Sequence, residues 1–171
     1  SYRELDDLSE RFAGLLHEHG VRQGDRVAVY LPNCPQFILA FFGILKLGAV
    51  HVPVNPMFRE TELAYELTDT GARAILCLDS LMPPLRQVRD RTQVESVFVT
   101  SFAEMLPAEP SFPVPPALLQ PKVACEDAID LLPALARVTA PAPAFAPDLD
   151  AVAALNYTGG TTGMPKGCIH T

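Results

Sequence analysis

The sequence has no excess of positive charge, no pattern of paired cysteines and no long hydrophobic run. Its net charge of −7 leaves no basic surface for nucleic acid or anionic lipid. The four cysteines lack both C-x-x-C spacing and the density of a disulfide scaffold, so we expect reduced and mostly buried thiols. The most apolar segment, 35–47, is too short to span a bilayer. No signal peptide opens the sequence, so we expect a cytoplasmic protein without a transmembrane segment or a nucleic-acid partner.

Segments with helical spacing alternate with short apolar segments that are typical of buried strands. Ser1 and Glu4 have the spacing of a capping box, and Gly20 suits the position after the helix that follows them. The alternation predicts an α/β fold with a largely parallel sheet, flanking helices and right-handed crossovers. The expected strands are 26–31, 49–54, 74–78 and 97–99, and the expected helices are 35–47, 61–70 (closed by Gly71) and 84–90.

Two residues of the second expected strand need comment. Pro53 indicates a sheet edge, a bulge or an early end of the strand, because proline cannot donate to the ladder. His51 lies among branched apolar residues, and we expect a core or rim histidine rather than a catalytic one.

The segment 157–167 reads YTGGTTGMPKG and combines four glycines, three threonines and one lysine. Glycines let successive backbone N–H groups turn inward around an anion. Threonine hydroxyls bind phosphate oxygens or Mg²⁺, and Lys166 adds a mobile positive charge. This is not a Walker A motif, because Lys166 precedes Gly167 and the next residues, 168–171, indicate a strand rather than a helix. The segment predicts a phosphate loop.

This loop resembles that of the adenylate-forming enzymes, which include acyl- and aryl-CoA synthetases, peptide-synthetase adenylation domains and luciferases. Their pattern is Tyr-Thr-Ser-Gly-Thr-Thr-Gly-x-Pro-Lys-Gly, and the sequence departs from it at Gly159, where the family has serine. Residues 1–5, SYREL, are similar to the family's Thr-Tyr-x-Glu-Leu segment. Residues 45–55, LKLGAVHVPVN, are similar to its Leu-Lys-x-Gly-Ala-x-x-Val-Pro-Ile-Asp segment. The resemblance covers roughly 1–100 and 149–171 and is strongest to acyl-CoA synthetases and fatty-acid-CoA ligases.

The proline-rich middle carries no such resemblance. Ten of the seventeen prolines lie between residues 101 and 150. We therefore expect an α/β subdomain over 1–100 and a connection across the surface over 101–148, with one helix near 126–135. Residues 149–171 are expected to form a strand, the phosphate loop and the following strand of the same domain.

The resemblance implies part of the N-terminal domain of an ATP-dependent acid–thiol ligase. Such an enzyme activates a carboxylic acid, here a fatty or aryl acid, as an acyl-adenylate and transfers it to coenzyme A. By the family match Thr158 binds Mg²⁺, while Thr161 and Thr162 contact phosphate. The full set of expected ATP-phosphate positions is Thr158, Gly159, Gly160, Thr161, Thr162, Gly163 and Lys166.

Family members run to several hundred residues, so the resemblance implies that this chain is an N-terminal part. The segments that support adenine and ribose, and the catalytic lysine of the C-terminal domain, have no counterpart here. We therefore expect no catalytic residue within the chain. We expect the chain alone to be inactive, to bind ATP poorly or not at all and to have a poorly defined loop, and its open sheet edge leaves a homodimer possible.

Three other interpretations stay open. The first is a peptide-synthetase adenylation domain, in which a carrier protein takes the place of coenzyme A. The second is a nucleotide-binding module without catalysis. The third is a structural α/β scaffold, which leaves the clustered threonines and Lys166 without a reason.

Overall fold

A computed structural model describes residues 1–143, 145–146, 148–159 and 164–171, and it contains one seven-stranded sheet in the order β5-β4-β3-β1-β2-β6-β7. Strands β1 to β6 pair in parallel, and β7 pairs with β6 in the antiparallel direction. The strands are β1 (Arg26–Tyr30), β2 (Val50–Pro53), β3 (Ala74–Leu78), β4 (Ser96–Thr100), β5 (Ile129–Asp130), β6 (Ala154–Thr158) and β7 (Lys166–His170). The α-helices are α1 (Tyr2–Glu18), α2 (Pro35–Lys46), α3 (Glu60–Thr70), α4 (Met82–Val88) and α5 (Leu131–Arg137). Short 3₁₀ helices are η1 (Asp79–Leu81), η2 (Arg89–Arg91), η3 (Phe102–Met105) and η4 (Pro116–Leu119).

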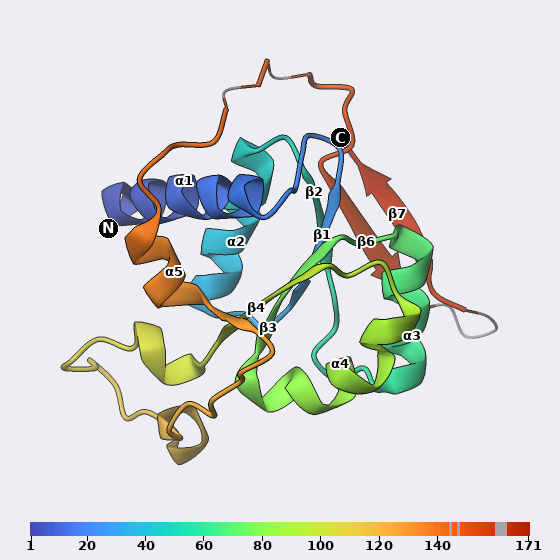
Figure 1. The fold of residues 1–171 in the computed structure, drawn as a ribbon. Coiled ribbons are helices and arrows are strands. Elements are labelled where there is room, and N and C mark those ends of the chain that lie inside the picture. Colours follow the sequence, from blue (N-terminus) through green and yellow to red (C-terminus); the bar gives the residue numbers. More distant parts are fainter. Residues whose placement is uncertain (144, 147, 160–163) are drawn as a thin grey trace.

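The sheet is covered on both faces. Helices α1, α2 and α5 lie on one face, and α3 and α4 lie on the other (Figure 1). Side chains alternate between the faces along each strand, so Val27 and Val29 of β1 contact the first helix layer. Ala28 and Tyr30 of the same strand contact the second. Burial on both faces explains why the strands appear in the sequence as continuous apolar segments.

The expected parallel sheet with flanking helices is confirmed. All four expected strands are present, with ends that differ by one residue at most. The capping box of Ser1 and Glu4 is present, and Gly20 follows α1 with a positive φ of 84°. Gly71 ends α3 in the left-handed conformation, as expected.

Pro53 is the last residue of β2, and β2 lies inside the sheet between β1 and β6. The early end of the strand is therefore the correct one of the three alternatives. The ladder resumes one residue later, where the Val54 amide donates to the Val29 carbonyl at 3.0 Å. His51 is buried in the same strand, as expected, at 3% exposure.

The segment 101–148 differs from the expected surface connection in one part. Strand β5 extends the sheet beside β4, and α5 buries Leu131 and Leu135 in the core. The helix expected over 126–135 begins only at Leu131, because a turn and β5 occupy its first half. Pro133 fits inside the first turn of α5, where a missing N–H removes no helical hydrogen bond. The proline content therefore obscured a segment that belongs to the core.

Among the residues that the structure describes, no helix combines the length and the apolar character needed to cross a bilayer.

Candidate phosphate-binding site

The expected phosphate loop connects the two strands of an antiparallel hairpin at one edge of the sheet (Figure 1). Thr158 is the last residue of β6, and Lys166 is the first residue of β7. The two residues pair across the ladder, and both are exposed. A hydroxyl and an ammonium group are thus brought to neighbouring positions at the two ends of the loop. The strand expected over 168–171 is confirmed and begins two residues earlier.

The structure describes three of the seven expected phosphate positions: Thr158, Gly159 and Lys166. Gly160, Thr161, Thr162 and Gly163 lie outside the described residues, and so does the expectation of a poorly defined loop. The Thr158 hydroxyl lies 3.7 Å from the Cys168 thiol across the hairpin, and Lys166 has no ion pair among the described residues.

Gly159 stands where the resembling family has serine, and the surrounding space does not require glycine. A Cβ atom built on Gly159 would meet no atom of the described residues within 4 Å. The Gly159 backbone is not among those with positive φ. No described atom therefore blocks a serine side chain at this position.

Helix α3 contacts both ends of the loop. The Tyr65 hydroxyl donates to the Pro165 carbonyl at 3.1 Å, and the Tyr157 hydroxyl donates to the Asp69 carboxylate. Burial raises the pKa of Tyr157, and the hydrogen bond to Asp69 raises it further, so the phenol stays protonated. Sequence reasoning missed Tyr65 and Asp69. Their i,i+4 spacing indicates that they share one face of the helix, but nothing in the sequence indicates which element that face contacts.

A cavity of about 590 Å³ adjoins the loop at the carboxyl ends of β1, β2 and β6. Ligands of open parallel sheets bind at this end of the strands. The cavity is lined by apolar and amide side chains together with Glu66, Tyr157, Gly159 and Pro165. It therefore has the position and the size of a site for a small organic molecule beside the loop.

Glu66 is the unexpected member of this lining. It is 1% exposed, and neither carboxylate oxygen has a hydrogen-bond partner among the described residues. Burial raises its pKa to about 7, because the low-dielectric surroundings disfavour the charged form. A carboxyl group that is half protonated near neutral pH thus lies beside the loop. The sequence did not indicate this placement, because a glutamate in an amphipathic helix is usually exposed to solvent.

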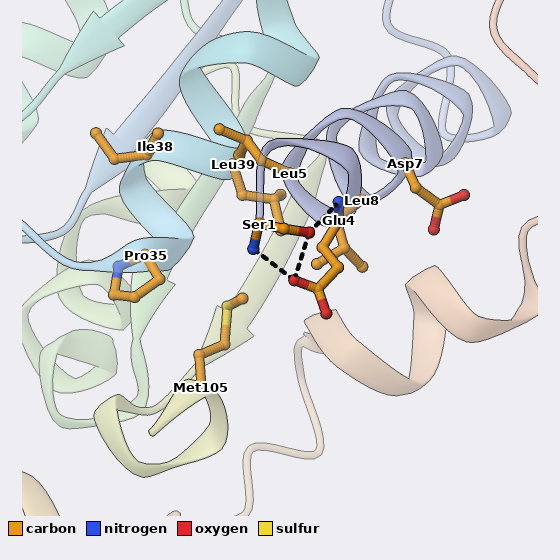
Figure 2. Close-up of a pocket in the computed structure, with 9 residues that line it drawn as sticks. All are labelled: Ser1, Glu4, Leu5, Asp7, Leu8, Pro35, Ile38, Leu39 and Met105. Atoms are coloured by element: carbon orange, nitrogen blue, oxygen red, sulfur yellow. Dashed lines mark hydrogen bonds and ion pairs between the residues drawn. The ribbon is translucent and has the colours of Figure 1, made fainter. Parts of the chain in front are cut away.

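A second cavity of about 590 Å³ lies between the N-terminal parts of α1 and α2 (Figure 2). Six of its nine lining residues are apolar: Leu5, Leu8, Pro35, Ile38, Leu39 and Met105. The Glu4 carboxylate, which also lines it, accepts a hydrogen bond from the Ser1 hydroxyl. None of the described phosphate-loop residues lines it, and its helices cover the sheet face opposite α3. The cavity has no part in the phosphate site.

The described end groups of the loop fit the triphosphate of ATP and its Mg²⁺. Lys166 offers an exposed cation, and Thr158 offers an exposed hard oxygen of the type that Mg²⁺ accepts. Among the described residues no three His, Cys, Asp or Glu side chains gather as a metal cage. Mg²⁺ commonly binds through few protein groups together with substrate phosphates, so this donor set agrees with it.

Comparison of the fold with solved structures gives the class of protein. A solved anthranilate CoA ligase in complex with anthranoyl-AMP superposes on 99% of this chain with a TM-score of 0.82, at 24% identity, and 29% of its own length is covered. The fold is that of the N-terminal domain of adenylate-forming acyl-CoA ligases.

The family follows from the sequence comparisons. The AMP-binding enzyme family matches residues 1–171, and the chain belongs to this family. A long-chain-fatty-acid–CoA ligase of Escherichia coli O6:H1 is 36% identical over 180 residues, which cover 100% of this chain and 32% of the relative. A crotonobetaine/carnitine–CoA ligase of Salmonella paratyphi A is 31% identical over 173 residues, which cover 100% of this chain and 30% of the relative. The chain therefore spans about a third of the length of these curated relatives.

Proposed function

We propose that the protein containing this chain is an ATP-dependent acyl-CoA synthetase that forms AMP. One observation carries the proposal: within the fold of this family, the β6–β7 hairpin brings Thr158 and Lys166 together at the two ends of the YTGGTTGMPKG loop. The relatives named above are CoA ligases, which supports coenzyme A as the acceptor thiol.

The chain's own residues would hold the leaving group. ATP·Mg²⁺, when bound, supplies an α-phosphorus that a substrate carboxylate attacks, so that the bond to the bridging oxygen breaks and pyrophosphate leaves. Lys166 would hold the β- and γ-phosphate oxygens, and its charge would offset the negative charge that grows on pyrophosphate. Thr158 would orient Mg²⁺ through its hydroxyl oxygen. The remaining loop positions, Gly159 to Gly163, would supply backbone and hydroxyl donors to the same phosphates.

We further propose a fatty or aryl acid as substrate, supported by relatives that are named for a long-chain fatty acid and for anthranilate.

A cytoplasmic location is also proposed. It is supported by the four free cysteines, because reducing compartments keep thiols reduced. A homodimer is also proposed through β7, whose five residues are all exposed at the sheet edge. Light scattering of the purified protein tests the homodimer.

The function is tested with the protein that contains this chain, purified and supplied with ATP, Mg²⁺ and a panel of fatty and aryl acids. We expect acid-dependent exchange of labelled pyrophosphate into ATP, and an acyl-CoA thioester together with AMP when coenzyme A is added. Exchange without thioester formation on coenzyme A would favour a peptide-synthetase adenylation domain. ATP binding without exchange for any acid would favour a nucleotide-binding module.

A further inference from the structure

The β6–β7 hairpin extends beyond the parallel sheet at its loop end. Strand β6 pairs with β2 only at His51 and Ala154, where the His51 amide donates to the Ala153 carbonyl at 2.9 Å. The β6–β7 ladder continues from there to the pair of Thr158 and Lys166. The loop end of the hairpin therefore lacks β2 as a partner and needs another support to keep a fixed position.

Helix α3 provides that support. Tyr65 donates to the Pro165 carbonyl on the β7 side of the loop, and Asp69 accepts from Tyr157 on the β6 side. Tyr65 and Asp69 are four residues apart, so they lie on one face of the helix. Among the described residues, these two are the only side-chain hydrogen bonds that join the hairpin to another element.

Packing fixes the same arrangement. The Tyr65 and Tyr157 rings meet edge to face, with centroids 6.4 Å apart and planes at 85°. The Tyr157 ring also lies close to Gly167, because a Cβ atom built on Gly167 would stand 3.0 Å from that ring. The Tyr157 ring therefore packs both against Tyr65 of α3 and against the backbone of β7 at Gly167.

We propose that Tyr65 and Asp69 are positioning residues that fix the two ends of the phosphate loop and thereby set its affinity for the triphosphate of ATP. They act through Pro165, the residue before Lys166, and through Tyr157, the residue before Thr158. Small displacements of such end groups weaken binding, because the contacts with phosphate depend on geometry. The choice of ligand rests on the proposed function, whereas the support of the hairpin by α3 does not.

The support is tested by hydrogen exchange of the protein that contains this chain, without ATP. We compare Tyr65→Phe and Asp69→Ala with the unaltered protein. Each substitution removes one of the two hydrogen bonds and leaves the sheet intact. In each variant the amides of β6 and β7 are expected to exchange about five- to tenfold faster, as the loss of one net hydrogen bond implies. The amides of β3 and β4 are expected to exchange at their original rates.

The positioning role is tested by pyrophosphate exchange at varied ATP concentration. We expect Tyr65→Phe to raise KM for ATP about fivefold and Asp69→Ala to raise it about tenfold, because the second variant removes a charged acceptor. Asp69→Asn keeps an acceptor oxygen for Tyr157, so KM is expected to return most of the way to its original value. A merely structural role would lower active protein and hence kcat, and would leave KM unchanged.

Matched controls are Tyr2→Phe, at a tyrosine that is 93% exposed, and Asp7→Ala, at an exposed aspartate of α1. Both controls should leave the hydrogen exchange of the hairpin and the KM for ATP unchanged.

Unchanged hydrogen exchange of the hairpin in the α3 variants, or equally faster exchange in all strands, would overturn the proposal. So would faster hairpin exchange with an unchanged KM. If the unaltered protein shows no acid-dependent exchange, the proposed function is refuted, and hydrogen exchange still decides whether α3 supports the hairpin.

Discussion

Thr158 and Lys166 pair across the antiparallel ladder at the point where β6 ends and β7 begins. The chain leaves the ladder at the first residue and returns at the second, so the ladder fixes the distance between the two ends of the loop. A Walker A loop obtains its anion site from the N-terminus of a helix. In this chain the groups proposed to bind phosphate depend instead on the hairpin and on the residues that support it.

Gly159→Ser tests the position where the sequence departs from the family pattern. The new side chain meets no atom of the described part of the chain within 4 Å, so folding should be unaffected. Its hydroxyl adds one donor toward phosphate, and KM for ATP in pyrophosphate exchange should fall by up to about fivefold, the equivalent of one net hydrogen bond.

Gly167→Ser is the matched control for that change. Its Cβ would lie 3.0 Å from the Tyr157 ring, so the ring or the strand must shift. We expect KM to rise in this variant. A higher KM for Gly159→Ser as well would show that position 159 requires glycine for a reason other than space.

The buried Glu66 predicts a loss of stability as pH rises. Its folded-state pKa is about 7, above the ordinary value of 4.5, so the folded chain holds the proton more tightly than the unfolded chain. The contribution is complete below about pH 4.5 and is lost as pH rises through 7. Between pH 5 and 8 the free energy of unfolding should fall by about 2–3 kcal/mol on this account.

Glu66→Gln should remove that dependence, which urea unfolding at pH 5, 6, 7 and 8 measures. Glu18→Gln, at an exposed residue of α1, should keep the original pH profile. If Glu66→Gln and the unaltered chain lose stability in parallel over this range, Glu66 is not the titrating group.

The buried His51 predicts the opposite dependence at acid pH. Its ring packs nearly perpendicular to the rings of both Phe37 and Phe41, and burial lowers its pKa to about 4 from 6.5. The folded chain therefore resists protonation, so this stability is complete above pH 6.5 and is lost as pH falls toward 4. Between pH 7 and 5 the contribution of His51 should fall by about 2 kcal/mol, which offsets most of the gain from Glu66 over the same range.

His51→Leu should remove this part of the acid sensitivity, and His17→Leu on α1 should retain it. The measurement is the midpoint and slope of urea unfolding at pH 7 and pH 5. The same change in stability from pH 7 to 5 in His51→Leu and in the unaltered chain would contradict the assignment to His51.

Much of the sheet could be predicted from the sequence. Strands buried on both faces must be apolar throughout, and runs such as 26–30 and 74–78 are bounded by turn residues. Strand β5 escaped prediction because it has only two residues. A helix was expected near 126–135, but its place in the core was not, because Pro133 and its neighbours resembled a surface segment. Burial of Leu131 and Leu135 depends on the other helices that cover the same face, which no local pattern reveals.

The two strands that flank the expected phosphate loop could likewise be predicted, but the contacts that support them could not. The composition of 157–167 indicates its chemistry, because glycine, threonine and lysine each contribute a known type of phosphate contact. The hydrogen bond from Tyr65 to Pro165 joins residues 100 positions apart. Such a contact follows from the parallel order of the sheet, which places β6 beside β2 and α3 above them, and not from either local segment.

The central claim is that Lys166 holds the phosphates of ATP, and it concerns a loop that contains no other cation. Lys166→Ala removes a charge-assisted contact of about 1.5–3 kcal/mol, which corresponds to about a 10- to 100-fold loss in kcat/KM for ATP. The matched control is Lys46→Ala, because Lys46 is a lysine that pairs with Asp6 on the far face of the sheet.

The decisive measurement is acid-dependent pyrophosphate exchange by the unaltered protein, Lys166→Ala and Lys46→Ala at varied ATP. We expect the 10- to 100-fold loss in Lys166→Ala alone, with Lys46→Ala equal to the unaltered protein. Exchange in Lys166→Ala at the rate of the unaltered protein would contradict the phosphate-binding role of the loop.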